Sequence, residues 1–388
     1  MVRSFIHDRL STFVIMDDYW KTSNFEDIWD ILRARSPFLQ SLKTRSPGYR
    51  GRKRKFEKDR KCLGDLVLHL EYLKEFICDW IQLPDNAVHH LISLTSLRIL
   101  SLRIANLQAL SCVCNLDANT SCPLHPPLRF LQELELHCDA IPTGSCMPAL
   151  RRFNTPALQL LNISSAFKAL SAQDTEALFA ALGGNFSYPN LKSIRLSTFI
   201  PVESMPELSS APSVMEPQPV VILHASALDS LTFPHLETFD LKSHFFDADD
   251  ADIERIVRGL PNLREFSVAC EGEIHYRRPF RIPRMTLVTI IAFAKHCPLL
   301  RRLQIFVDMK GWPLDVGVRN LTHDALERLS LGDSPLADIE GYKTVFRLVD
   351  TLFPNLRDFS WNDEHDQASD SRICRCLGSE EFFSDPSL

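Results

Sequence analysis

Four side chains in one stretch of the chain could together bind a metal ion: Cys112, Cys114, Cys122 and His125. Three thiolates and one imidazole are sufficient for a tetrahedral zinc site. Their spacing matches none of the paired patterns of common zinc fingers, and the prolines and cysteines of residues 112–127 indicate a loop inserted between structural elements. We therefore expect free cysteines in an insertion, with no metal and no cofactor.

Two segments rich in carboxylates could bind a cation or act in catalysis. Residues 247–252 carry four aspartates but lack the glycine and the distant bidentate glutamate of an EF-hand calcium loop. They precede an apolar stripe with helical spacing, so we expect them to cap that helix. Residues 363–366 combine carboxylates with a histidine, without an identifiable nucleophile, and we expect a polar terminal segment. No phosphate-binding or nucleophile-elbow motif occurs, which argues against an enzyme.

A basic run extends from Lys43 to Lys61, where ten of nineteen residues are lysine or arginine. It could be a nuclear import signal or a nucleic-acid contact. Only Tyr49 and Phe56 accompany it as aromatic residues, so base stacking has little support. A net charge of −6 also argues against a polyanion partner for the whole chain. The favoured interpretation is a solvated basic insertion at 43–61; the residues of the alternative import signal are Arg50, Arg52, Lys53, Arg54 and Lys55.

The elements that position these residues are set by a repeated phrase. It reads YPNLKSIRL from Tyr188, FPHLETFDL from Phe233, LPNLREFSV from Leu260, CPLLRRLQI from Cys297 and FPNLRDFSW from Phe353. Its core is leucine, two variable residues, an apolar residue, one variable residue and a second apolar residue. Self-similarity of this kind is typical of a solenoid.

Weaker copies of the phrase extend the pattern to eleven units, separated by 24 to 45 residues. Irregular spacing indicates insertions, and the longest interval contains the proline- and serine-rich loop 201–219. The leucines that open the units are Leu39, Leu73, Leu97, Leu131, Leu158, Leu191, Leu236, Leu263, Leu300, Leu326 and Leu356.

Each unit also contains a helical half. Residues 25–32 are expected to form the first helix, 171–174 resemble a helix N-cap, and residues 253–260, 287–294 and 345–352 have apolar side chains at helical spacing. A proline after each helix turns the chain toward a short strand. The predicted fold is therefore an α/β leucine-rich-repeat solenoid (a horseshoe), with a parallel sheet on the concave side and helices on the convex side.

This interpretation divides the chain into three parts. Residues 1–24 are expected to be an N-terminal cap or the remnant of a missing module, 25–365 the solenoid, and 366–388 a polar tail. The eleven cysteines, an odd number without a secretion signal, indicate reduced thiols and an intracellular protein, cytoplasmic or nuclear. The apolar stretch 287–294 is too short to cross a membrane. Cys78, Cys270 and Cys297 are expected to be small buried residues.

The phrases at Leu260 and Cys297 resemble the divergent repeats of F-box/leucine-rich-repeat proteins, especially those of mushroom-forming fungi. The resemblance covers about residues 28–361. It implies substrate receptors of cullin-type ubiquitin ligases, in which the repeats hold a target and an N-terminal F-box docks the adaptor. Two departures stand out: Glu271, Asp308 and Glu364 replace the usual Asn or Cys that closes the strand, and no F-box is recognisable. A cullin adaptor is thus expected as a partner only if a degenerate F-box exists.

A protein target is expected on the concave face, where alternate strand residues point outward. The alternatives are a repeat-only scaffold or regulator without a ubiquitin link, and a nuclear nucleic-acid-associated protein that uses the basic run. The register predicts these outward residues: Glu133, Glu135, His137, Arg195, Asp240, Lys242, Glu265, Arg302, Gln304, Phe306, Arg328 and Asp358.

Overall fold

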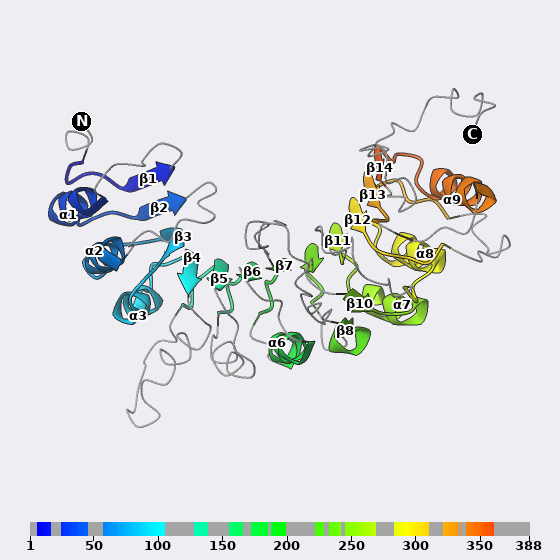
Figure 1. Ribbon diagram of the computed structural model, residues 1–388, viewed down its shortest axis with the longest axis horizontal. Helices are drawn as coiled ribbons and strands as arrows, with labels where there is room; N and C mark the ends of the chain where they lie inside the picture. Colours follow the sequence, from blue (N-terminus) through cyan, green and yellow to red (C-terminus); the bar gives the residue numbers. More distant parts are fainter. Residues whose placement is uncertain are drawn as a thin grey trace, which may run out of the picture. The chain divides into compact units, whose positions relative to one another are not determined.

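The computed structural model describes residues 6–16, 25–45, 57–104, 128–138, 155–165, 172–184, 188–198, 222–228, 233–241, 245–268, 283–309, 321–332, 334 and 339–360. The chain forms two compact units, residues 1–219 and 220–388. Each unit repeats one arrangement, a helix followed by a turn and a strand of a parallel sheet (Figure 1).

The first unit contains a parallel sheet in which the strands follow one another in chain order, each paired with the next. Helices precede several strands and lie along one side of the sheet (Figure 1). Its elements are β1 (Thr12–Met16), α1 (Phe25–Arg35), β2 (Ser41–Arg45), α2 (Glu57–Val67), β3 (Glu75–Gln82), α3 (Asp85–Ser93), β4 (Ile99–Ile104), β5 (Glu133–Cys138), β6 (Leu160–Ser165), α6 (Ala172–Gly184) and β7 (Ser193–Thr198).

The second unit repeats this plan with shorter strands, in the order β9-β11-β12-β13-β14. A separate pair, β8 and β10, is also parallel. The elements are β8 (Ile222–His224), the 3-10 helix η3 (Ala225–Leu228), β9 (Thr238–Leu241), β10 (Phe245–Asp247), α7 (Asp250–Arg258), β11 (Glu265–Ser267), α8 (Leu287–His296), β12 (Arg302–Gln304), β13 (Arg328–Ser330), α9 (Ile339–Leu352) and β14 (Asp358–Ser360).

The leucine that opens each predicted repeat is an anchor of the core. All eleven of these leucines are buried, and in every case a strand begins two residues later. The carbonyl of the residue after the anchor accepts two backbone N–H bonds from the next repeat. That of Gln40, for example, accepts from Lys74 and Glu75 at 2.7 and 3.0 Å. The predicted repeat register and the α/β leucine-rich-repeat fold are therefore confirmed.

Strand β1 adds a repeat that the sequence interpretation did not include. It pairs in parallel with β2, and the carbonyl of Ser11 accepts from the N–H groups of Gln40 and Ser41, as the carbonyl of Gln40 does from the next repeat. Leu10 stands two residues before the strand, at the anchor position. The repeat architecture thus extends into residues 1–24, which were expected to be a cap or the remnant of another module.

The basic segment 43–61 is also partly regular structure. Lys43 lies within β2, and Lys61 lies within α2, so both ends of the expected insertion belong to repeat elements. Lys43 is an alternate-strand residue beside Glu75 of the neighbouring strand, which explains its place in the sheet. Only residues 46–56 of the segment lie outside the described residues.

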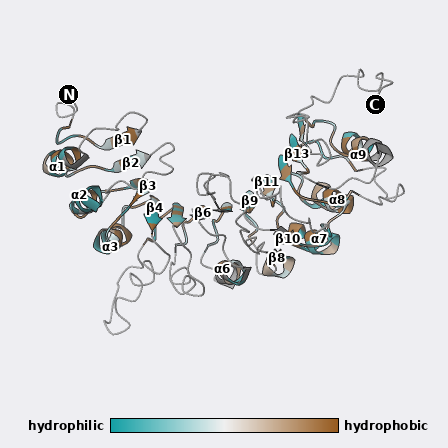
Figure 2. Cartoon of the chain, in the orientation of Figure 1, coloured by the Kyte–Doolittle hydropathy of each residue, from teal (hydrophilic) through white to brown (hydrophobic). Residues whose placement is uncertain are grey.

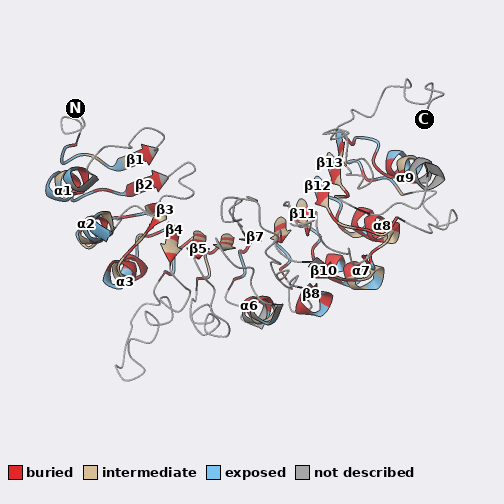
Figure 3. Cartoon of the chain, viewed as in Figure 1, coloured by how far each residue is buried: buried red, intermediate tan, exposed pale blue. Residues whose placement is uncertain are grey.

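Apolar side chains from strands and helices form the core of each unit. Figure 2 shows hydrophobic and hydrophilic residues together on the helices, and Figure 3 shows buried residues along the strands. In the second unit, the ring of Phe266 lies 5.5 Å from that of Phe239 and 4.8 Å from that of Phe293 of α8. Contacts between rings at these distances add to the gain from burial. Cys78 and Cys297 are buried, as expected, and Cys270 lies outside the described residues.

The turn before each anchor holds neighbouring repeats together through the residue that directly precedes the leucine. In three repeats this residue is an asparagine whose side-chain amide donates to a carbonyl in the turn of the preceding repeat. Asn190 donates to Pro156 at 2.8 Å, Asn262 to Pro234 at 2.7 Å, and Asn355 to Asp324 at 3.0 Å. The Pro-Asn-Leu form of the phrase therefore reflects bonding between repeats.

Candidate protein-interaction surface

Alternate residues of the parallel strands form a face on the side of each sheet away from the helices, here called the strand face. The expected residues that the structure describes occupy alternate strand positions or extend them, and each of these is half-buried or exposed. Lys242 lies outside the described residues. On the described strands, the side chains between them are core residues such as Leu134, Leu136 and Leu303. The repeat pattern in the sequence therefore distinguishes residues on the strand face from residues in the core.

In the first unit, the strand face carries a charged contact that sequence reasoning did not single out. The Glu75 carboxylate accepts from the Lys43 ammonium and from the Ser41 hydroxyl, both at 2.8 Å. These two donors hold the pKa of Glu75 below its ordinary value, the lysine having the larger effect. Because Ser41 and Lys43 lie on β2 and Glu75 lies on β3, these contacts join the two strands at their surface.

His137 is the centre of a polar row on the same face. Its Nδ1 lies 2.7 Å from the hydroxyl of Ser164 on β6, and its Nε2 lies 3.4 Å from that of Ser101 on β4. The neighbouring strand residues Glu133 and Glu135 are half-buried, and Arg195 of β7 is exposed. This part of the strand face can therefore offer carboxylates, an imidazole and a guanidinium to a bound molecule.

In the second unit, four charged residues lie side by side across four strands. Glu265 is paired with Arg302, Arg302 with Arg328, and Arg328 with Asp358 in the strand register. The Arg302 guanidinium forms an ion pair with Glu265 at 3.3 Å. Within the described segments, the exposed side chains of Arg328 and Asp358 form no ion pair, so both charges remain available.

A second row of this face is neutral and rich in hydroxyl groups. Ser267, Gln304, Ser330 and Ser360 stand next to one another in the register, and the Ser267 hydroxyl donates to the Gln304 side-chain carbonyl at 3.2 Å. Phe306, two residues beyond Gln304, is half-buried. A charged row, a hydrogen-bonding row and a ring thus lie together, which is the mixture of groups common in protein interfaces.

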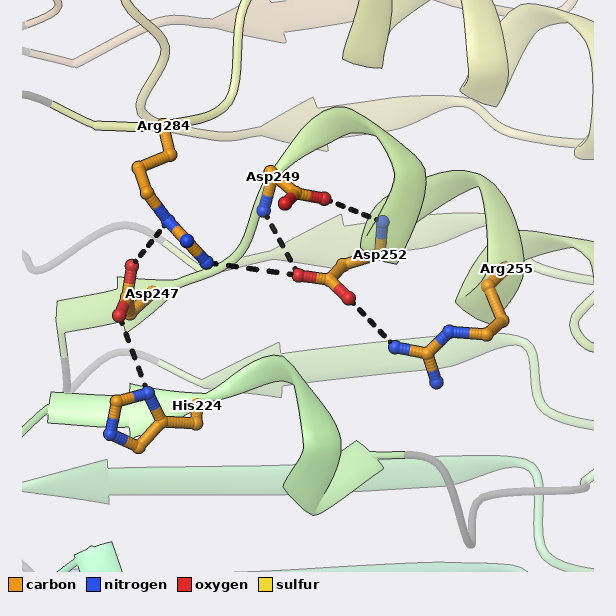
Figure 4. Close-up of polar contacts among 6 residues, drawn as sticks. All are labelled: His224, Asp247, Asp249, Asp252, Arg255 and Arg284. Atoms are coloured by element: carbon orange, nitrogen blue, oxygen red, sulfur yellow. Dashed lines mark hydrogen bonds and ion pairs between the residues drawn. The ribbon is translucent and has the colours of Figure 1, made fainter.

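The four aspartates of 247–252 are structural, and helix capping is confirmed. Asp249 is the N-cap of α7, and it forms a reciprocal capping box with Asp252. Figure 4 shows the surrounding polar contacts: Asp247 contacts His224 and Arg284 at 3.3 and 3.0 Å, and Asp252 contacts Arg255 at 2.8 Å. Their oxygens face donors of this chain, which leaves little reason to expect a cation.

Asp250 joins this helix to the next one. Its carboxylate accepts from the backbone N–H and the hydroxyl of Thr286, both at 2.8 Å, and from the hydroxyl of Thr289 at 2.6 Å. Thr286 is the N-cap of α8. One carboxylate at the start of α7 therefore fixes the start of α8, and neither threonine was singled out by sequence reasoning because its partner lies in another repeat.

Several sequence-based candidates lie outside the described residues: the cysteine and histidine cluster in 112–127, the loop 201–219, the import-signal residues between 50 and 55, and the segment 363–366. Within the segments that are described, no group of three or more histidine, cysteine or acidic side chains could hold a metal ion. In those same segments, no helix is long and apolar enough to cross a membrane.

Comparisons with known proteins give distant structural likenesses only. No family model matches the chain, and no curated protein matches it. Two solved structures cover 92% and 84% of the chain at TM-scores of 0.30: a plant peptide hormone receptor, RGFR1, in complex with RGF2 (12% identity), and a TLR13–ssRNA13 complex (16% identity).

The chain spans about half the length of these two proteins, 56% and 42% respectively. The Rad7 and Elc1 complex of yeast matches 76% of this chain and 84% of its own, at 14% identity and a TM-score of 0.27. At these TM-scores, the assignment of a leucine-rich-repeat fold depends on the register of this chain's own strands.

Proposed function

We propose that this chain is a non-enzymatic solenoid that binds a protein target on the strand face. The observation that carries the proposal is the row of Glu265, Arg302, Arg328 and Asp358, in which the last two charges have no ion-pair partner within the described segments. Charged groups held in place by a rigid sheet cost little further ordering when a complementary surface binds. Electrostatic complementarity then contributes specificity and the rate of association.

The test is a pull-down from the native cell extract, followed by binding measurements with the proteins recovered. Replacing Arg302 and Phe306 together by alanine is expected to weaken target binding by at least ~10-fold without lowering the melting temperature by more than a few degrees. The matched control is Arg347→Ala, because Arg347 is exposed on helix α9, away from the strand face. Equal affinity of the double variant and the native chain would remove this face as the target site.

The finer proposal is that the chain acts as the target-binding part of a cullin-type ubiquitin ligase, as the resemblance to F-box/leucine-rich-repeat proteins implies. Recovery of the cullin adaptor in the same pull-down, retained in the Arg302 and Phe306 variant, would support an adaptor site separate from the target site. Recovery of other proteins without the adaptor would favour a repeat-only scaffold or regulator. The two outcomes are distinguishable because target binding is measured independently.

A further inference from the structure

In several repeats, the turn residue directly before the anchoring leucine forms a hydrogen bond to the preceding repeat. Asn190, Asn262 and Asn355 donate to the preceding repeat from this position, and Ser96 donates to the carbonyl of Leu73 at 2.7 Å. The repeats of one chain serve as internal controls for one another. The turn also forms with alanine at this position, as at Ala157 and Ala325, so folding of the turn does not require an aromatic side chain there.

Three repeats of the first unit place an aromatic ring at this position. The exposed fractions are 57% for Phe38, 51% for Tyr72 and 50% for Phe130, which are among the most exposed large hydrophobic residues of the described segments. The rings of Phe38 and Tyr72 lie 5.6 Å apart. Half-exposed rings gain only part of the free energy of burial, while contiguous exposed apolar groups are typical of interaction sites. We call Phe38, Tyr72 and Phe130 the aromatic turn row.

Positive charge surrounds the aromatic turn row. Lys74 follows the anchor of the Tyr72 repeat, and Arg98 follows the anchor of the next repeat, which lies between Tyr72 and Phe130; both are exposed, and neither side chain forms an ion pair within the described segments. The guanidinium of Arg129 lies 5.9 Å from the centre of the Phe130 ring. In the three aromatic repeats, one acidic residue lies directly next to a turn residue or an anchor among the described residues. It is Glu71, beside Tyr72. The row therefore combines exposed rings with an excess of cations.

The spacing of the repeats indicates the shape of the binding partner. Neighbouring strands of a sheet are about 4.8 Å apart, so the four repeats from Phe38 to Phe130 span about 14 Å. Apolar side chains three and four residues apart on one face of a helix are about 5–6 Å apart, and three turns of helix extend about 16 Å. Phe38 and Tyr72 are one strand spacing apart, and Phe130 lies two spacings beyond Tyr72 because Ser96 occupies the turn between them. A helical stripe of about three turns matches the length of this row.

We propose that the aromatic turn row binds an acidic amphipathic helix of a partner protein. Apolar side chains of that helix contact Phe38, Tyr72 and Phe130, and its flanking carboxylates pair with Lys74 and Arg98. This site is separate from the strand face and does not depend on the function proposed above. Rings surrounded by polar groups are the usual centres of binding free energy in such interfaces.

The probe is a fluorescein-labelled synthetic peptide of about 15 residues, with leucines at i, i+4, i+7 and i+11 and glutamates on both flanks of the stripe. Its binding to the full chain is followed by fluorescence anisotropy. The Tyr72→Ala and Phe130→Ala double variant is expected to lose at least ~10-fold in affinity. Leu299→Ala is the matched control, because Leu299 has the same turn position and is 43% exposed but lies in the second unit.

Charge provides the second arm of the experiment. Replacing Lys74 and Arg98 by alanine is expected to weaken binding and to reduce its dependence on salt, because two cations no longer attract the glutamates. A peptide with lysine at every glutamate position is expected to bind at least ~10-fold more weakly. Equal binding of the lysine peptide would show that the row does not select acidic partners and would overturn the proposal.

Two further results would also overturn it. One is an affinity for the acidic peptide weaker than about 1 mM, or one that the ring variants leave unchanged. The other is self-association of the chain in sedimentation experiments that the Tyr72→Ala and Phe130→Ala variant abolishes, since a second copy would then be the occupant. Melting temperatures within about 3 °C of the native chain show that the variants are folded.

Discussion

Replacing Asp250 by alanine is expected to destabilise the second unit by about 3 kcal/mol. The carboxylate accepts three hydrogen bonds, from two groups of Thr286 and from the hydroxyl of Thr289. Thr289 is fully buried, so its hydroxyl loses its acceptor without access to water, at a cost of about 1–3 kcal/mol. The two groups of Thr286 are half-buried and can bond to water, which limits their contribution to about 0.5–1 kcal/mol each.

The measurement is urea unfolding followed by circular dichroism. Asp85→Ala is the matched control: Asp85 is the first residue of α3, as Asp250 is of α7, but it makes no side-chain hydrogen bond within the described residues. Removing Asp85 takes away only a favourable interaction with the helix dipole, about 0.3–1 kcal/mol. The difference between the two variants isolates the contacts with α8.

A double-mutant cycle tests the mechanism. Thr289→Val removes the buried hydroxyl, so Asp250→Ala on that background is expected to cost about 1–2 kcal/mol less than in the native chain. Additive effects, or a cost for Asp250→Ala no larger than that for Asp85→Ala, would refute the bridging role of this carboxylate.

Three further predictions concern single side chains. Gly64→Ala places a Cβ 2.8 Å from two atoms of the Pro84 ring and should destabilise the first unit by about 1–3 kcal/mol in urea unfolding, despite a better helix propensity. Lys43→Met should destabilise the chain at about pH 7. Because the folded pKa of Glu75 is depressed, that contribution is present above the unfolded pKa and is lost as pH falls through the folded value, so the difference between the variants should shrink as the solution is acidified. Burial raises the pKa of the Cys297 thiol to about 12, so maleimide should label it only after unfolding, as peptide mass spectrometry can show.

The repeat register was predictable because each anchor combines a leucine with a fixed distance to the strand. Leu263 and Phe266 illustrate this: the spacing of three residues places both in the core, and Glu265 on the opposite face. Helix α7 was equally evident, since its capping aspartates and apolar stripe are adjacent in sequence. Signals confined to about ten consecutive residues thus determine most of the fold.

The missed features depend on partners from other repeats. Strand β1 follows Leu10 in the leucine phrase, but neither a proline turn nor a preceding apolar helix marks it, and its pairing with β2 supplies the missing information. Lys43 was assigned to a solvated insertion by its basic neighbours, whereas its position beside Glu75 decides its structure. The composition of a segment describes only an average over its residues. It therefore cannot predict the position of a side chain that depends on one contact with another repeat.

The asparagines of the turns have a consequence for how the chain unfolds. Each bond from Asn190, Asn262 or Asn355 ends on the preceding repeat, so it stabilises the interface between neighbours and adds nothing to a repeat in isolation. In a one-dimensional array of repeats, the free energy of the interfaces between neighbours determines cooperativity, meaning the number of repeats that unfold together. Removing one amide therefore allows the array to separate at that junction, so that its two sides unfold at different urea concentrations.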